Sequence, residues 1–238
     1  MSSDLTGYEP GSSSSWRGRV DATEPRAALR WHQIVVCLDL CESASSGDEP
    51  PGFCFVGYPC DEGVARNLGR RGAEAGPRDI RRAHANLPVG VTEEVGLYDA
   101  GDVGCPHGDV EAAQLALAAA VARIRARGHF PIVLGGGHDL EYGHWLGVRR
   151  SLSHQDRLGV ISFDAHFDLR PHNRGASSGT SFSQIARACQ GEDGGLAYLC
   201  LGLQPSANTV QLFRIADELG VRYELARNIV GEDLDRIR

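Results

Sequence analysis

The stretch that decides the fold runs from Gly135 to Asp168. It opens with Gly135-Gly136-Gly137-His138-Asp139 and closes with Ile161-Ser162-Phe163-Asp164-Ala165-His166-Phe167-Asp168. An apolar run precedes each motif, at 130–134 and at 158–163, and each has the length and composition of a buried strand. The sequence therefore predicts two strands that both end in side chains able to bind a metal ion.

The second motif carries the stronger metal signal. Asp164, His166 and Asp168 are spaced by two, so in an extended backbone all three point to one side. Each carboxylate would otherwise need its own partner, because an unpaired buried charge is costly. The glycines before His138 allow a tight turn beside its imidazole. Since the loop has neither of the phosphate-binding glycine spacings, we interpret it as part of a metal site.

The donor types indicate which metal. Carboxylates and imidazoles without thiolates suit Mn²⁺, whereas a closed structural zinc site would show cysteines. The two segments offer more donors than one open catalytic site usually takes from two segments. A two-metal centre with a bridging carboxylate is therefore credible, and it would lower the pKa of a shared water.

Composition excludes several classes of function. The chain has 238 residues and a formal net charge of −7 with no basic stripe, which disfavours a nucleic-acid partner. No run approaches the ~20 apolar residues of a membrane span, and no export signal opens the chain. Seven cysteines without a CxxC pair favour reduced thiols and a cytoplasmic location.

Strand and helix patterns alternate along the chain. We expect strands at 53–57, 94–98, 130–134, 158–163, 196–201 and 221–225, and helices at 77–86, 110–127, 141–150, 182–189 and 208–219. This alternation predicts a three-layer α-β-α fold with a mostly parallel sheet, whose ligands lie beyond the carboxyl ends of the strands. Residues 31–238 form one predicted domain, and the Ser-rich segment 1–30 is predicted to be weakly ordered.

The motifs resemble those of the ureohydrolases, the arginase and agmatinase group of binuclear manganese hydrolases. The resemblance lies in Gly136–Asp139, in Asp164–Asp168, and in a segment from Asp61 to Arg81 that is similar to their N-terminal signature. Within the group, further stretches look like formimidoylglutamases: Asp168-Leu169-Arg170, Ser177-Ser178-Gly179-Thr180, Gln184-Ile185 and Leu201-Gly202-Leu203-Gln204 with Asn208-Thr209.

The resemblance implies an enzyme that hydrolyses C–N bonds of linear amidines. Formimidoylglutamases convert N-formimidoyl-L-glutamate to L-glutamate and formamide in histidine degradation. By this resemblance His138 and Asp168 would hold one Mn²⁺, His166 the other, and Asp164 would bridge them. A metal-bridging hydroxide would attack the formimidoyl carbon, and no further catalytic side chain is assigned.

Three residues are expected to bind this small-molecule substrate. The guanidinium of Arg170 can pair with a carboxylate, and glutamate carries two. Ser178 and Thr180 match family positions that bind the amino-acid end of the substrate. Thr180-Ser181-Phe182 stands where arginases carry a histidine, which argues against arginase. Another activity of the group, such as guanidinobutyrase or agmatinase, remains the alternative, and the matches at Asn67 and Gly76-Pro77 disfavour a zinc deacetylase.

One family motif is not found. Ureohydrolases carry a further strand-end Asp-x-Asp pair, and Asp233 and Asp235 lie in a helical pattern that does not provide it. We therefore expect an arginase-like domain without its C-terminal portion, with an incomplete second metal site and an exposed sheet edge. A truncated, catalytically impaired scaffold that binds metal weakly is the other reading. A homo-oligomer is compatible with both.

Overall fold

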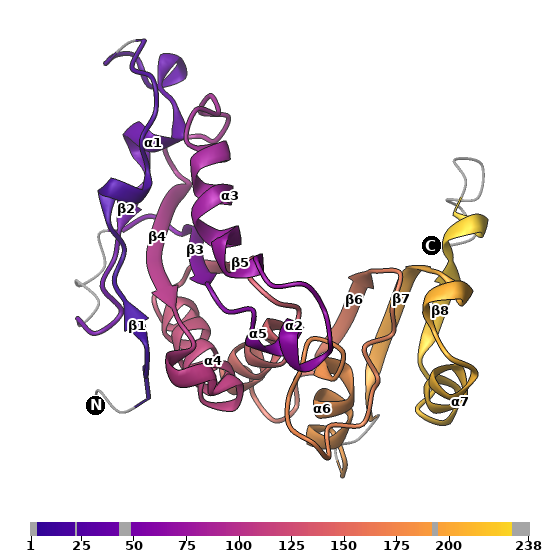
Figure 1. The fold of residues 1–238 in the computed structure, drawn as a ribbon. Coiled ribbons are helices and arrows are strands. Elements are labelled where there is room, and N and C mark those ends of the chain that lie inside the picture. The colour runs from indigo at the N-terminus through magenta and orange to yellow at the C-terminus, as the bar shows by residue number, and fades with distance from the viewer. Residues whose placement is uncertain (1–3, 22, 43–48, 192–194, 230–238) are drawn as a thin grey trace.

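The computed structural model describes residues 4–21, 23–42, 49–191 and 195–229. Its strands form two sheets, which Figure 1 shows splayed apart. The first sheet has five strands in the order β1-β4-β3-β5, with β2 also on β4, and the second has three in the order β6-β7-β8. All pairings are parallel except that of β1 with β4. The strands are β1 (Tyr8–Glu9), β2 (Val36–Cys37), β3 (Gly52–Tyr58), β4 (Gly96–Val103), β5 (Phe130–Gly135), β6 (Gly159–Phe163), β7 (Ala197–Leu203) and β8 (Arg222–Leu225).

Seven α-helices connect or cover these strands in the described part of the chain. They are α1 (Trp31–Ile34), α2 (Glu62–Arg66), α3 (Gly76–His84), α4 (Val110–Ala126), α5 (Leu140–Arg150), α6 (Ser181–Ala188) and α7 (Val210–Glu218). Asp109 caps α4 as its sequence predicts, since its side chain accepts a hydrogen bond from the Ala112 amide at 3.0 Å. None of these helices is long and apolar enough to cross a membrane.

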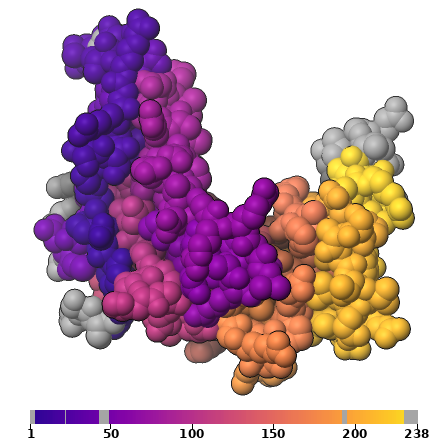
Figure 2. Space-filling model, viewed as in Figure 1, coloured from indigo at the N-terminus to yellow at the C-terminus, as the bar shows by residue number. Residues whose placement is uncertain are grey.

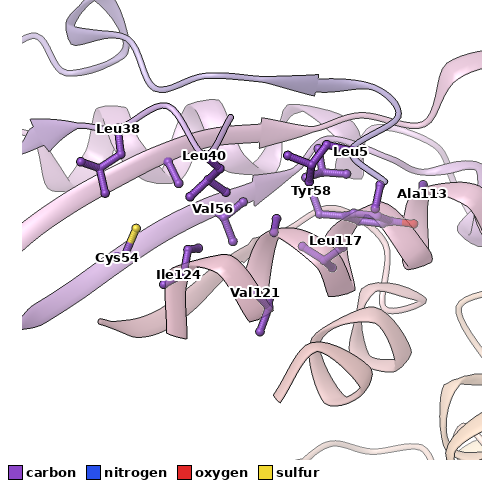
Figure 3. Close-up of a cluster of buried hydrophobic side chains, with 14 of the residues drawn as sticks. Leu5, Leu38, Leu40, Cys54, Val56, Tyr58, Ala113, Leu117, Val121 and Ile124 are labelled. Atoms are coloured by element: carbon purple, nitrogen blue, oxygen red, sulfur yellow. The ribbon is translucent and has the colours of Figure 1, made fainter. Parts of the chain in front are cut away.

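Helices cover both faces of the first sheet. On one face, Leu117 and Ile124 of α4 pack against Val56 and Tyr58 of β3, as Figure 3 shows. On the other face, a smaller cluster joins Trp16 to Phe55 and Leu134, with α1 and α3 beside it. This half of the molecule therefore has the predicted three layers.

Within the described residues, helices cover the second sheet on one face only. Phe182 and Ile185 of α6 and Leu212 of α7 pack against that face, together with Trp145 of α5. Because α5 also packs along α4, it links the two sheets. Side chains of β6 on the opposite face remain exposed, so the expected covering of both faces holds for the first sheet alone.

The N-terminal segment differs from the weak order that its composition suggests. Strand β1 pairs with β4, and the side chain of Trp16 is buried. The indole Nε1 of Trp16 donates a hydrogen bond to the buried carboxylate of Asp99, which Arg81 also neutralises. Strand pairing and a buried aromatic side chain thus attach a Ser-rich segment whose composition predicts little structure.

The long loop expected between the first strand and α3 is in fact partly helical. Helix α2 and a short 3-10 turn, Ala73–Ala75, lie inside it. Ion pairs between Arg71 and both Asp61 and Glu62 support α2, a feature that hydrophobic periodicity does not report. The expected helix from Glu232 onward, with Asp233 and Asp235, lies outside the described residues.

Candidate metal centre and substrate pocket

His138 lies in a turn directly after β5, where the chain passes close to the end of β3. The amide of Gly136 donates to the Tyr58 carbonyl at 3.2 Å, and that of Gly137 donates to the Cys60 carbonyl at 2.7 Å. A Cβ on Gly136 would lie 2.1 Å from the Tyr58 carbonyl oxygen, so this close approach requires glycine. The glycines therefore allow the His138 turn to pack directly against the backbone at the end of β3.

Asp139 fixes the same turn from inside. Its side chain is fully buried, and its Oδ2 accepts a hydrogen bond from the Tyr58 hydroxyl at 2.8 Å. Its main-chain carbonyl accepts another from Nε2 of Gln114 at 2.7 Å. Burial raises the pKa of the Asp139 carboxyl, and the Tyr58 hydrogen bond partly offsets this. Asp139 thus positions the turn instead of facing the site.

The Asp164–Asp168 segment leaves the extended conformation at the end of β6. Asp168 has a positive φ of 47°, which bends the chain back toward β5. Asn208 secures the segment, because its Oδ1 accepts from the Phe167 amide at 3.1 Å and its Nδ2 donates to the Ala165 carbonyl at 2.8 Å. The segment is therefore not a regular strand, although Asp164, His166 and Asp168 all line one pocket, as their spacing predicts.

Three of the four predicted ligands come together at the carboxyl ends of β5 and β6. Donor atoms of His138, Asp164 and Asp168 all lie within 4.8 Å of one another. Nδ1 of His138 is 2.6 Å from Oδ2 of Asp168 and 3.3 Å from Oδ2 of Asp164. The cluster joins a residue that follows a strand of the first sheet to residues that follow a strand of the second.

His166 stands beside this cluster and not in it. Its side chain is 54% exposed, and its Nδ1 lies 3.2 Å from Oδ1 of Asp164. Its amide also donates to that oxygen at 3.0 Å, which turns Asp164 toward the His166 backbone. His166 nevertheless lines the same pocket as the cluster.

A pocket of about 190 Å³ opens over the cluster. Its wall includes all four predicted ligands together with Arg170, Ser178 and Asn67. The Nδ2 of Asn67 donates to the Ser178 hydroxyl at 3.2 Å, and the Ser178 amide donates to the Gly63 carbonyl at 3.0 Å. Arg170 is exposed, and a Cβ on Gly179 would lie 2.9 Å from its Cδ, so Gly179 leaves room for the arginine.

Thr180 does not line this pocket. It is buried, and its hydroxyl donates to the Ser177 carbonyl and accepts from the Ser177 amide, each at 2.9 Å. The threonine therefore closes the turn that presents Ser178. Its expected contact with substrate stays a prediction.

Both the sequence and the fold of this chain match those of known proteins. A model of the arginase family matches residues 51–237. The chain belongs to the arginase family. Its relatives include a formimidoylglutamase from Chromobacterium violaceum, which is 50% identical over 224 residues. The match covers 94% of this chain and 69% of the relative. Another, from Clostridium tetani, is 43% identical over 231 residues, 95% of this chain and 68% of the relative.

Solved structures of the arginase family agree. A Trypanosoma cruzi formiminoglutamase determined with Mn²⁺ matches with a TM-score of 0.68 and 27% identity, covering 83% of this chain and 68% of that one. The predicted resemblance, the arginase-like α/β fold and the hydrolase class are thereby confirmed. The chain spans about two thirds of the length of these relatives.

The donor set of this arginase-family chain fits a divalent cation. Burial alone would lower the pKa of His138, but hydrogen bonds to Asp168 and Glu141 outweigh it and raise the pKa to about 11. The carboxylates lie so close to the imidazole that the site favours a positive charge. A bound metal ion would supply that charge. Glu141 lies at Nε2 of His138, 3.0 Å away, which leaves Nδ1 facing Asp164 and Asp168.

Sequence reasoning missed three residues that shape the site. Glu141 follows His138 by three positions, the helical spacing that places two side chains on one face. One buried oxygen of Glu141, Oε2, has no hydrogen-bond partner among the described residues. Asn208 and Asn67 belong to stretches that carry the family resemblance, but their side-chain contacts depend on segments far away in the sequence.

Proposed function

We propose that this chain is a formimidoylglutamase-type enzyme that uses Mn²⁺ to hydrolyse N-formimidoyl-L-glutamate to L-glutamate and formamide. The convergence of His138, Asp164 and Asp168 beneath a pocket that also contains Arg170 carries the proposal. The names of the relatives support the substrate, because formimidoylglutamases are among those at up to 50% identity. The role in histidine degradation and a cytoplasmic location belong to the same proposal.

We assign the metal-binding side chains as expected from the sequence. His138 and Asp168 would hold one ion, Asp164 would bridge, and His166 would serve the second ion from its position beside Asp164. Bound Mn²⁺ would supply Lewis-acid polarisation and a water of lowered pKa. Glu141 would keep the His138 imidazole oriented by accepting its Nε2 hydrogen.

Arg170 and Ser178 would bind the glutamate portion. Arg170 is the arginine on the pocket wall, and a guanidinium recognises a carboxylate through two parallel hydrogen bonds. The Ser178 hydroxyl can donate a further hydrogen bond while it accepts one from Asn67. An acidic amidine fits this wall better than an agmatine-like amine, whose positive end would meet Arg170.

The test is an assay of purified, Mn²⁺-loaded chain on three substrates. We expect glutamate release from formimidoylglutamate and no turnover of agmatine or 4-guanidinobutyrate. Turnover of agmatine or 4-guanidinobutyrate with formimidoylglutamate left intact would overturn the substrate assignment. Asp164→Asn serves as the matched inactive control.

A second candidate is a catalytically impaired scaffold that binds metal weakly. It is favoured by the ligand count, since in the described part of the chain three donors form the cluster and His166 stands apart. The same purified protein separates the two: absence of turnover on all three substrates, with Mn²⁺ bound at less than one ion per chain, would favour the scaffold.

A further inference from the structure

The two pocket residues assigned to the glutamate portion, Arg170 and Ser178, lie in one loop. This loop, residues 169–180, contains no helix or strand, so no backbone ladder fixes its shape. Its two ends contact each other, because the Arg170 amide donates to the Gly179 carbonyl at 2.9 Å. The directions of the Arg170 and Ser178 side chains therefore depend on the contacts that hold the loop from outside.

An ion pair from the half of the molecule with the first sheet holds the middle of this loop. Arg66 ends α2, and its Nη1 donates to both carboxylate oxygens of Glu111 in α4, at 3.1 and 3.0 Å. The same nitrogen donates to the Ala176 carbonyl at 3.1 Å, and Oε1 of Glu111 accepts from the Ala176 amide at 2.7 Å. The pair thus binds the main chain on both sides of Ala176. Figures 1 and 2 show α2 against the loop that precedes α6.

The loop fits closely around this pair. Gly175 has a φ of +100°, and a Cβ at this position would lie 3.1 Å from Oε1 of Glu111 and 3.4 Å from Nη1 of Arg66. The side chain of Ala176 is buried. Burial alone would raise the pKa of Glu111, but the Ala176 amide and Arg66 outweigh it and lower the pKa, so the carboxylate is charged at neutral pH.

The neighbours of this pair reach the rest of the site. Gln114 lies three residues after Glu111 on the same face of α4, and its Nε2 donates to the Asp139 carbonyl beside His138 at 2.7 Å. Asn67 directly follows Arg66, and its Nδ2 donates to the Ser178 hydroxyl at 3.2 Å. One face of α4 and the end of α2 therefore hold both the candidate metal turn and the loop of the pocket wall.

We propose that Arg66 and Glu111 are positioning residues that hold loop 169–180 so that Arg170 and Ser178 face the substrate's carboxylates. The proposal rests on the proposed function, which supplies an acidic substrate. Neither Arg66 nor Glu111 is among the residues that line the pocket, so both act through the loop. An isolated surface ion pair usually contributes little to stability. This pair differs because it also binds the main chain of the loop.

The first test is steady-state kinetics of Arg66→Met. The KM for formimidoylglutamate should rise about tenfold while kcat stays within about twofold, because the change affects binding and leaves the metal ligands in place. The rise in melting temperature with Mn²⁺ should be kept. Arg78→Met is the control, since Arg78 pairs with Asp79 at an exposed position on α3, and its KM should not change. An unchanged KM in Arg66→Met overturns the proposal, even if the variant is less stable.

A double-variant cycle tests whether the two side chains act together. The KM of Arg66→Met/Glu111→Gln should stay within about twofold of that of Arg66→Met, because the first change already releases the loop. Independent rises that multiply in the double variant overturn the assignment of a joint role. Glu111→Gln carries these measurements alone if Arg66→Met does not fold.

Amide hydrogen exchange tests the same contact without substrate or metal. Exchange in residues 175–180 should be faster in both single variants than in the parent, and unchanged in Arg78→Met. Equal exchange in all of them overturns the proposal. A parent chain that turns over no substrate would overturn the proposed function instead, and the exchange rates would then decide alone whether the pair holds the loop.

Discussion

The hydroxyl of Tyr58 donates a hydrogen bond to the buried carboxylate of Asp139 over 2.8 Å. Tyr58 ends β3, and Asp139 directly follows His138, so the bond holds the candidate metal ligand against a strand of the first sheet. Burial raises the pKa of Tyr58 above its ordinary value, and the adjacent Asp139 charge raises it further, so the hydroxyl remains a donor at neutral pH.

Replacing Tyr58 with Phe should destabilise the protein. The change leaves a fully buried carboxylate without its donor, and we expect the free energy of unfolding to fall by about 1–3 kcal/mol. Urea denaturation measures this loss. Tyr98→Phe is the control, because the Tyr98 hydroxyl donates to the Pro50 carbonyl near the surface, and its loss should be smaller. An equal fall in the free energy of unfolding for both variants would show that the Tyr58–Asp139 hydrogen bond contributes no more to stability than the Tyr98–Pro50 bond.

Arg170 should determine the affinity for an acidic substrate. In Arg170→Gln the KM for formimidoylglutamate should rise by about 10- to 100-fold, because hydrogen bonds to a charged group contribute about 1.5–3 kcal/mol. The matched control is Arg174→Gln, an exposed arginine of the same loop that does not line the pocket. A fall in kcat with KM unchanged would contradict a role in binding.

Metal should stabilise the folded chain through the three-residue cluster. With Mn²⁺ at about one hundred times its Kd the melting temperature should rise by about 5 °C or more, and a chelator should reverse the rise. Asp168→Asn should abolish the rise, whereas Asp156→Asn, at an exposed loop position, should keep it.

Metal content after dialysis gives a second readout. We expect less than two ions per chain by elemental analysis, because His166 stands outside the cluster. Two tightly held ions in the 238-residue chain would refute that expectation.

His129 should make stability depend on pH. Its ring is buried and stacks on Tyr98 with 4.1 Å between ring centroids. Burial lowers the pKa of His129 below its ordinary value of 6.5, although Glu49 at 3.5 Å partly offsets this. Below pH 6.5 the unfolded chain therefore binds a proton that the folded protein does not, and stability falls as the pH drops.

The variant His129→Phe keeps the stacked ring and removes this titration. Its free energy of unfolding should vary less with pH between about 6.5 and 5 than that of the parent. Urea denaturation at a series of pH values measures the slope. His154→Phe, in an exposed loop, is the control and should keep the parent's slope. An unchanged slope in His129→Phe would exclude His129 as the source.

Most of the helices and strands, and the positions of the candidate metal ligands at strand ends, could be predicted from the sequence. Apolar runs ending in ligand side chains place His138, Asp164 and Asp168 at strand ends, and the structure brings these three together. Spacing could not predict that His166 lies outside the cluster, because the segment from Asp164 to Asp168 is not a regular strand and Asn208 holds its backbone through long-range hydrogen bonds.

Strand order was also beyond local sequence patterns. Neither β5 nor β6 shows in its own residues which strand it pairs with, so a single sheet and two separate sheets have the same local pattern. The anchoring of the described part of residues 1–30 likewise depends on long-range contacts, such as that of Trp16 with Asp99 and the pairing of β1 with β4, which composition does not reveal.

His138 follows β5 and Asp168 follows β6, so their 2.6 Å contact is a bridge between the two sheets. A cation held by these side chains would link two sheets that share no backbone hydrogen bonds among the described residues. The angle between the sheets and the affinity for the ion are then coupled quantities. Whatever fixes that angle would therefore also change how strongly these side chains hold an ion.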